Sequence, residues 1–227
     1  MALLGGVGIT LQQLLQVTGQ VHASAGLAAF LASTAPAFLV VLAALFLGEP
    51  LSRWQVVGVC LATVGAGVVS EGGDWLALIH SDPGNLSNLL VLLSAVVWAV
   101  FSLLNRGLGR GRPAVLFTSG MMAFGSLFTL PLFIARKGWI ELSGLSPSAW
   151  GSLFIITLLS TALAYLLYTH ALKLTDASRL AAIQNLEPLI AVLAAIILLG
   201  EVVTSSFILG GAAILTGVYL AERGRLT

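Results

Sequence analysis

The first 48 residues of this chain contain no Asp, Glu, Lys or Arg. The whole sequence of 227 residues is 58% hydrophobic and only 8% charged, whereas soluble domains carry roughly 25% charged residues. A soluble fold could not keep such a stretch in water. The apolar runs are long and continuous, unlike the alternating segments of about ten residues that build a membrane β-barrel. The sequence therefore predicts an all-α integral membrane protein.

Eight apolar segments approach the length of about 20 residues that a helix needs to cross the hydrocarbon core of a bilayer. Several of the connections between them are very short, so consecutive helices are expected to be antiparallel neighbours. The predicted fold is a polytopic bundle of eight transmembrane helices, at about residues 2–20, 24–47, 53–70, 86–104, 114–134, 149–171, 178–199 and 204–222.

Basic residues are distributed unevenly between the two sides that these helices define. Both termini and alternate connections share one side, which holds eight of the ten Lys and Arg residues, against Arg136 and Lys137 on the other. Cytoplasmic loops carry the excess of Lys and Arg. We therefore expect a protein of the bacterial inner membrane with both termini cytoplasmic, an external loop at 71–85 and a cytoplasmic tail at 223–227. The basic residues are dispersed, so no nucleic-acid footprint is present.

The sequence also contains an internal duplication, which constrains the arrangement of the helices. Pro36 is followed by Leu47-Gly48-Glu49, and 152 positions later Pro188 is followed by Leu199-Gly200-Glu201 at the same spacing. The same offset pairs Gly58 with Gly210 and Gly65 with Gly217. The two proline helices are the second and the seventh, an odd separation, so the copies face opposite ways. This pattern predicts an inverted-topology repeat, whose halves rock against each other to give alternating access to a midplane site.

The two halves are unequal in length. Residues 1–70 form an incomplete first repeat of three helices, and residues 86–222 form a complete second repeat of five. We therefore expect that two N-terminal helices of the repeat pattern are absent from this chain.

These motifs resemble a known family. The paired Pro…Leu-Gly-Glu segments with their following glycines, and the Leu186-Glu187-Pro188 form in the second half, are similar to the EamA family of the drug/metabolite transporter superfamily, from Met1 to about Glu222. The resemblance implies ten helices as two inverted five-helix repeats, and export of metabolites, amino acids or drugs. This chain has the pattern 3+5 where the family has 5+5.

Glu187 is the most conspicuous candidate for binding a solute. It lies about nine residues into its predicted helix, roughly 13 Å at 1.5 Å per residue, where an ionisable group costs on the order of a few kcal/mol and usually faces a cavity. Pro188 cannot donate a backbone hydrogen bond, so the carbonyl of Gln184 is freed. We predict that Gln184, Asn185 and Glu187 line the cavity, with Glu187 binding a substrate amine or a proton. The alternative is a hydrogen-bonded packing site beside a kink. The equivalent stretch of the first copy, 32–36, has no acid.

Other polar side chains fall on single helical faces. One face on the fourth helix contains Ser94, Trp98, Ser102 and Asn105, and one on the sixth contains Thr157, Thr161, Tyr165 and Tyr168, while the first helix carries Gln16. Of these we expect Trp98, Ser94, Tyr165, Tyr168 and Gln16 to contact an aromatic or amphipathic solute. The alternative is interhelical hydrogen bonding, worth about 0.6 kcal/mol per contact.

The remaining motif residues have structural interpretations. Gly48 and Gly200 suit the end of a helix, and Glu49 and Glu201 are expected to cap or pair locally. The glycines Gly58, Gly65, Gly210 and Gly217 are expected to let the third and eighth helices approach a neighbour closely, as scaffold or as a homodimer contact.

Several function classes are excluded by missing motifs. The sequence has no Gly-x-Ser-x-Gly, no His-Glu-x-x-His and no Walker-type phosphate loop, so an enzyme, a cofactor, a metal site and ATP-driven pumping are not expected. The leading prediction is a secondary transporter that exports small organic solutes, with proton coupling left open. The alternative is a non-transporting membrane subunit or inactive truncated carrier.

Overall fold

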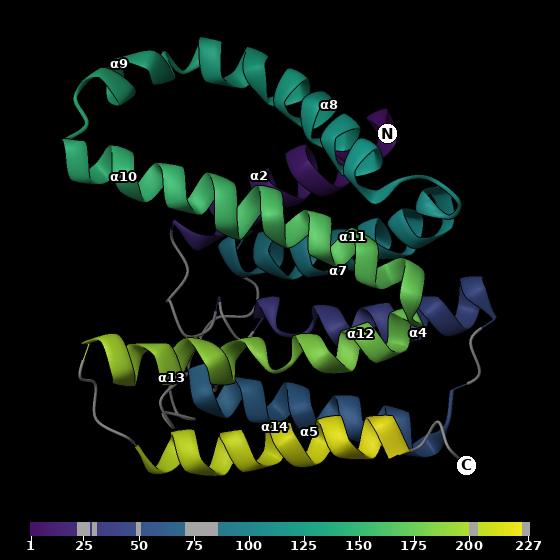
Figure 1. The fold of residues 1–227 in the computed structure, drawn as a ribbon. Coiled ribbons are helices and arrows are strands. Elements are labelled where there is room, and N and C mark those ends of the chain that lie inside the picture. Colours follow the sequence, from purple (N-terminus) through teal and green to yellow (C-terminus); the bar gives the residue numbers. More distant parts are fainter. Residues whose placement is uncertain (22–27, 29–30, 49–50, 71–85, 200–203, 224–227) are drawn as a thin grey trace. The chain divides into compact units, whose positions relative to one another are not determined.

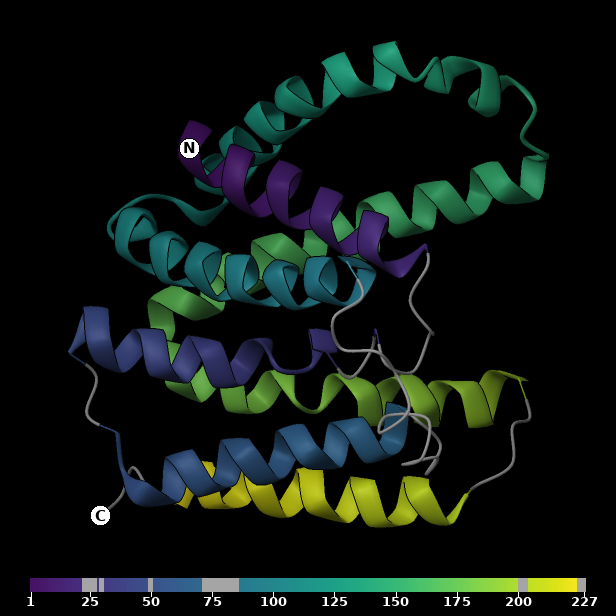
Figure 2. The same cartoon turned by 180° about the vertical axis from the view of Figure 1, so that it is seen from behind.

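The computed structural model describes residues 1–21, 28, 31–48, 51–70, 86–199 and 204–223 (Figures 1 and 2). Within these ranges every regular element is helical and no strand occurs. This agrees with the all-α class predicted from the long apolar runs.

Three helical runs are long and apolar enough to cross a membrane. They are α7 (Leu86–Gly109), α8 (Ala114–Ala135) and the continuous run Pro147–Leu174, with 24, 22 and 28 residues. At about 1.5 Å per residue each exceeds the roughly 30 Å of a hydrocarbon core. The third run consists of α10 (Pro147–Ile155), a π-helical stretch η2 (Ile156–Leu163) and α11 (Ala164–Leu174).

The other helices are shorter but lie on the remaining predicted segments. The first run consists of α1 (Ala2–Leu4), the π-helical η1 (Gly5–Leu11) and α2 (Gln12–Gln20), and the others are α4 (Ala35–Leu47), α5 (Arg53–Ser70), α12 (Ala177–Gln184), α13 (Glu187–Leu199) and α14 (Ser205–Arg223). Part of the segment predicted at 24–47 lies outside the described residues. A short helix, α9 (Gly138–Ser143), occupies a connection for which no helix was predicted.

Two helices predicted as single segments are interrupted by a turn. Residues 33–34 form a turn before α4, and residues 185–186 form a turn between α12 and α13, 152 positions later. In each case proline follows as the second helical residue, where its missing N–H leaves no intrahelical bond unmade. The breaks thus occur at the offset that relates the two proline motifs in the sequence.

Two compact units divide the chain. One contains residues 1–11 and 104–174, and the other contains residues 12–103 and 175–227. They do not coincide with the halves predicted at 1–70 and 86–222, because packing defines the units whereas sequence similarity defines the halves. The division into repeats stays a prediction.

In the second unit α5 and α14 lie side by side, as both views show. A Cβ added at Gly58 would meet the carbonyl oxygen of Gly217, and one added at Gly65 would lie 2.7 Å from the carbonyl oxygen of Gly210. Helices can approach this closely only where the side chain is a hydrogen. Next to this contact Ala66 and Ile214 are fully buried.

Only part of the two Leu-Gly-Glu motifs lies within the described residues. Gly48 ends α4 in the left-handed region, with φ +65°, and its N–H donates to the carbonyl of Ala43. Glycine adopts this conformation without strain. Glu49, Gly200 and Glu201 lie outside the described residues.

The close approach of α5 and α14 predicts that alanine in place of Gly58 destabilises the protein. We expect Gly58→Ala to lower the stability of the detergent-purified protein by about 1–3 kcal/mol, because the added methyl group overpacks the contact. The measurement is the thermal unfolding midpoint. The control is Gly107→Ala on α7, where no atom lies within 4 Å of an added Cβ. Equal midpoints for the two variants would contradict the packing.

Candidate functional site

The turn between α12 and α13 contains a buried amide without a partner. Asn185 is 1% exposed, and neither its Oδ1 nor its Nδ2 has a hydrogen-bond partner among the described residues. The Oε1 of the neighbouring Gln184 is also buried without a partner. Each such group costs about 1–3 kcal/mol when it is left unsatisfied. A ligand or water that supplied the missing hydrogen bonds would stabilise this arrangement.

The backbone around this turn is held by packing on one side. Leu186 and Leu189 contact the buried pair Ala66 and Ile214 of α5 and α14. The N–H of Asn185 donates to the carbonyl of Ala182 at 3.3 Å. These contacts fix the turn, so its polar side chains are presented by a supported backbone.

Glu187 begins α13 and its side chain is exposed. A carboxylate at a helix N-terminus is stabilised by the positive end of the helix dipole and by free N–H groups. Its position two residues after Asn185 therefore combines one anionic group with unpartnered amides at a single helix break.

The equivalent turn in the first half has different chemistry. Thr34 donates its hydroxyl hydrogen to the carbonyl of Leu31 at 2.6 Å, so the turn is closed by its own side chain. Ala35, at the position equivalent to Glu187, is buried. The asymmetry between an acidic and an apolar copy, read from the sequence, is thus present in the local structure.

Three other predicted contact residues, which belong to the same compact unit (residues 12–103 and 175–227) as this turn, have local partners. The hydroxyl of Ser94 donates to the carbonyl of Val91 at 2.6 Å, and Gln16 Oε1 accepts from Gln12 Nε2 at 2.7 Å. The ring of Trp98 lies 5.3 Å from that of Phe101, centroid to centroid. Gln12 is one of the polar residues of the first helix but was not predicted to contact a solute, and it keeps a buried Oε1 without a partner in the described ranges. Its burial depends on tertiary packing, which the polar pattern of the helix does not reveal.

The two predicted tyrosines belong to the other compact unit. Tyr165 is 7% exposed, and its hydroxyl donates to the carbonyl of Gly8, in η1, at 3.3 Å. Tyr168 is half-buried. The cavity that the tyrosines were predicted to share with Glu187 stays a prediction.

The predicted polar face of the sixth helix is interrupted by η2. Four-residue spacing assumes an α-helix throughout, but η2 contains both Thr157 and Thr161 and follows the wider π-helical geometry. Thr157 is exposed whereas Tyr165 is buried. The single face expected for these residues is therefore wrong. On α7, which is α-helical throughout, Ser94, Ser102 and Asn105 are all buried.

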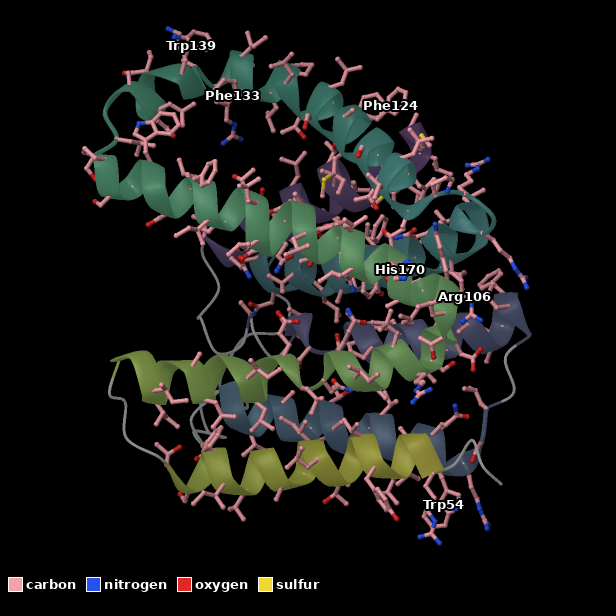
Figure 3. All side chains as sticks on the ribbon, viewed as in Figure 1. Trp54, Arg106, Phe124, Phe133, Trp139 and His170 are labelled. Carbon is pink, nitrogen blue, oxygen red and sulfur yellow. The ribbon has the colours of Figure 1, made fainter. Side chains whose placement is uncertain are left out.

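The unit of residues 1–11 and 104–174 contains a pocket that the sequence did not predict. It has a volume of about 560 Å³ between α8, α9 and α10, and its lining is mostly apolar with Arg136 and Glu141. The rings of Phe133 and Trp139, both labelled in Figure 3, are in edge contact at this end of α8 with centroids 6.4 Å apart. A volume of this size suits a small organic molecule.

Metal binding has no support in the part of the chain that the structure describes. No group of three or more His, Cys, Asp or Glu side chains is placed there to hold an ion.

Comparison with known protein families gives one match over most of the chain. The EamA-like transporter family matches residues 1–71 and 85–223. The chain belongs to the EamA-like transporter family. It is therefore an integral membrane protein of a family of small-solute transporters, and it is not an enzyme.

Relatives from several organisms match nearly the whole chain. An uncharacterized transporter of Archaeoglobus fulgidus is 29% identical over 98% of this chain and 76% of its own length. A probable terminal-alkyne amino-acid exporter of Streptantibioticus cattleyicolor is 32% identical over 99% of this chain and 73% of its own. A probable amino-acid metabolite efflux pump of Salmonella typhimurium is 25% identical over 86% of this chain and 67% of its own.

A solved structure has the same fold. A protein crystal structure superposes with a TM-score of 0.82 at 19% identity, covering 98% of this chain and 76% of the other. This likeness concerns the fold alone.

Because the Asn185 amide has no partner in the described part of the chain, its removal is expected not to destabilise the solute-free protein. Asn185→Leu should leave the thermal unfolding midpoint of the solute-free protein unchanged or raise it, because it replaces a buried unsatisfied amide with an apolar group. The matched control is Asn105→Leu. Asn105 is also 1% exposed and its Oδ1 also lacks a partner among the residues described, but its Nδ2 donates to Thr169 Oγ1 at 3.0 Å. The loss of this bond should lower stability by about 1 kcal/mol. A comparable loss for Asn185→Leu would show that the amide has a structural partner.

Proposed function

We propose that this protein is a secondary transporter that exports small organic solutes across the bacterial inner membrane by alternating access. The observation that carries the proposal is the helix break at residues 185–186, where a buried amide without a partner adjoins an acidic residue at the start of α13. Interrupted helices with free polar groups are the usual form of solute sites in transporters.

The chemistry of this break favours a solute that bears an amine. The Glu187 carboxylate binds an ammonium group, while the amides of Asn185 and Gln184 can donate to and accept from a carboxylate or carbonyl. Two of the related proteins are named as exporters of amino acids or their metabolites. We therefore propose amino acids and related amines as the solute class.

The inverted repeat supplies the mechanism in this proposal. Its support is the 152-residue offset shared by the two turns and by the two π-helical segments, of which η1 at 5–11 corresponds to residues 157–163 within η2. Because the two repeats have opposite orientations, they can exchange conformations, and each exchange opens the site to the other side of the membrane. The excess of Lys and Arg supports cytoplasmic termini.

Energy coupling in this proposal comes from an ion gradient. The sequence has no phosphate-binding loop for ATP, and Glu187 is the ionisable side chain at the helix break. Intramembrane carboxylates of this kind act as proton carriers in transporters. We propose that Glu187 binds the solute amine and a proton in alternation, so that proton entry releases the solute.

The test is transport by the purified protein in liposomes. With radiolabelled amino acids as probes, we expect Glu187→Gln and Asn185→Ala to lower the initial rate of flux by about tenfold or more, the effect of losing roughly 1.4 kcal/mol or more of interaction with the solute. Imposing a pH gradient should accelerate the wild type and leave Glu187→Gln unaffected.

The control is Glu222→Gln, the same chemical change near the end of α14. Its flux should equal that of the wild type. Equal flux in all three variants would rule out the break as the solute site. Absence of flux in a correctly folded wild type would favour the non-transporting subunit.

A further inference from the structure

The connection between α7 and α8 holds a group of basic side chains at the end of two long apolar helices. Arg110 and Arg112 lie in this connection, where Gly111 adopts a left-handed conformation with φ +74° and the N–H of Arg112 donates to the carbonyl of Gly109 at 3.2 Å. The ammonium group of Lys173, near the end of α11, donates to the carbonyl of Arg112. Arg106 and His170, labelled in Figure 3, lie at the same end of this unit.

A buried aromatic ring positions two of these charges. The guanidinium carbon of Arg112 lies 5.6 Å from the centroid of the Phe117 ring, and Lys173 Nζ lies 6.0 Å from it. The ring itself is fully buried, and a Cβ added at Gly109 would lie only 3.1 Å from one of its carbons. Cations at this distance from a ring face are attracted by its quadrupole. The two positive groups are therefore held near each other by a fixed element.

These two charges lack an anionic partner in the described ranges of the chain. Neither Arg112 nor Lys173 makes an ion pair there, and their contacts are the hydrogen bonds and ring contacts given above. Two like charges at one aromatic ring repel each other. An anion beside the ring would offset this repulsion, and α7, α8 and α11 contain no acidic residue to supply one.

The start of α8 adds further donors. Pro113 precedes this helix without a side-chain cap, and the first turn contains no acidic residue. The N–H groups of Ala114, Val115 and Leu116 have no acceptor within the helix, and they form the positive end of its dipole. An anion beside Arg112 would thus face both side-chain and backbone donors.

We propose that this basic cluster, formed by Arg110, Arg112 and Lys173 at the start of α8, binds the phosphate group of an anionic phospholipid. Guanidinium groups match phosphate oxygens in a two-pronged geometry. A lipid is the source of this phosphate because the cluster lies where two apolar spans end. On the first turn of α8 the side chains of Val115 and Leu116 are 64% and 63% exposed, so they offer apolar surface to an acyl chain. The proposal does not depend on which solute is transported.

The test is lipid binding by the purified protein in detergent. Phosphatidylglycerol, phosphatidylcholine and inorganic phosphate are added separately, and the thermal unfolding midpoint and the number of bound lipids by native mass spectrometry are recorded. We expect phosphatidylglycerol to raise the midpoint at concentrations where the other two do not. The double variant Arg112→Gln and Lys173→Gln should weaken phosphatidylglycerol binding about 25-fold, at about fivefold for each charge removed near an anionic headgroup.

Two further variants make the result specific. Arg136→Gln with Lys137→Gln removes the same charge at the opposite end of α8 and should leave phosphatidylglycerol binding unchanged. Arg110→Gln removes a charge whose side chain is exposed and makes none of these contacts, so it cannot act by disrupting the fold, and it should weaken binding about fivefold.

Three results would overturn the proposal. They are equal binding of phosphatidylglycerol and phosphatidylcholine, equal weakening by the control pair at the other end of α8, and stabilisation by inorganic phosphate at the concentrations at which the lipid acts. The last result would assign the cluster to a soluble phosphate compound.

Discussion

The requirement that every backbone N–H and C=O within hydrocarbon finds a partner in the protein determines most of this structure. Helices meet the requirement along their length, so a departure from helix is confined to places where side chains or packing replace the lost bonds. At residues 33–34 the hydroxyl of Thr34 bonds the carbonyl of Leu31. At residues 185–186 the backbone is held by turn bonds and by leucines packed on α5 and α14. The polar site therefore occurs where the helix is interrupted but its backbone is still held by hydrogen bonds and packing.

The positions of the helices could be predicted from the sequence because long apolar runs are a strong signal in a membrane protein. The place of Glu187 beside a break could also be predicted, since the proline and the acid are adjacent in the chain. Which buried amides would lack partners could not be predicted. The Nδ2 of Asn105 donates to Thr169, 64 positions away, although its Oδ1 has no partner, whereas neither amide atom of Asn185 has one within the described residues. That difference depends on tertiary neighbours, which hydropathy and spacing do not encode.

The sequence also did not predict which segments would be π-helical and which α-helical. The residues of η2 are as apolar as those of α10 before it, so hydropathy alone does not distinguish the π-helical from the α-helical state. Helix α9 was missed for a different reason. Its six residues, Gly138–Ser143, are too few for periodicity to be detected, and Lys137 before them adopts a left-handed conformation that is uncommon in a non-glycine residue.

The two π-helical segments have a geometric consequence for the side chains that follow them. A π-helical turn contains more residues than an α-helical turn, so it shifts the angular phase of everything beyond Leu11 and Leu163. Returning one residue of such a segment to α register would rotate the remainder of the helix by about 100° and move it along its axis by only about 1.5 Å. In the two runs that contain η1 and η2, a return to α register would therefore change the face that the following residues present, while the helix ends would nearly keep their depth in the bilayer.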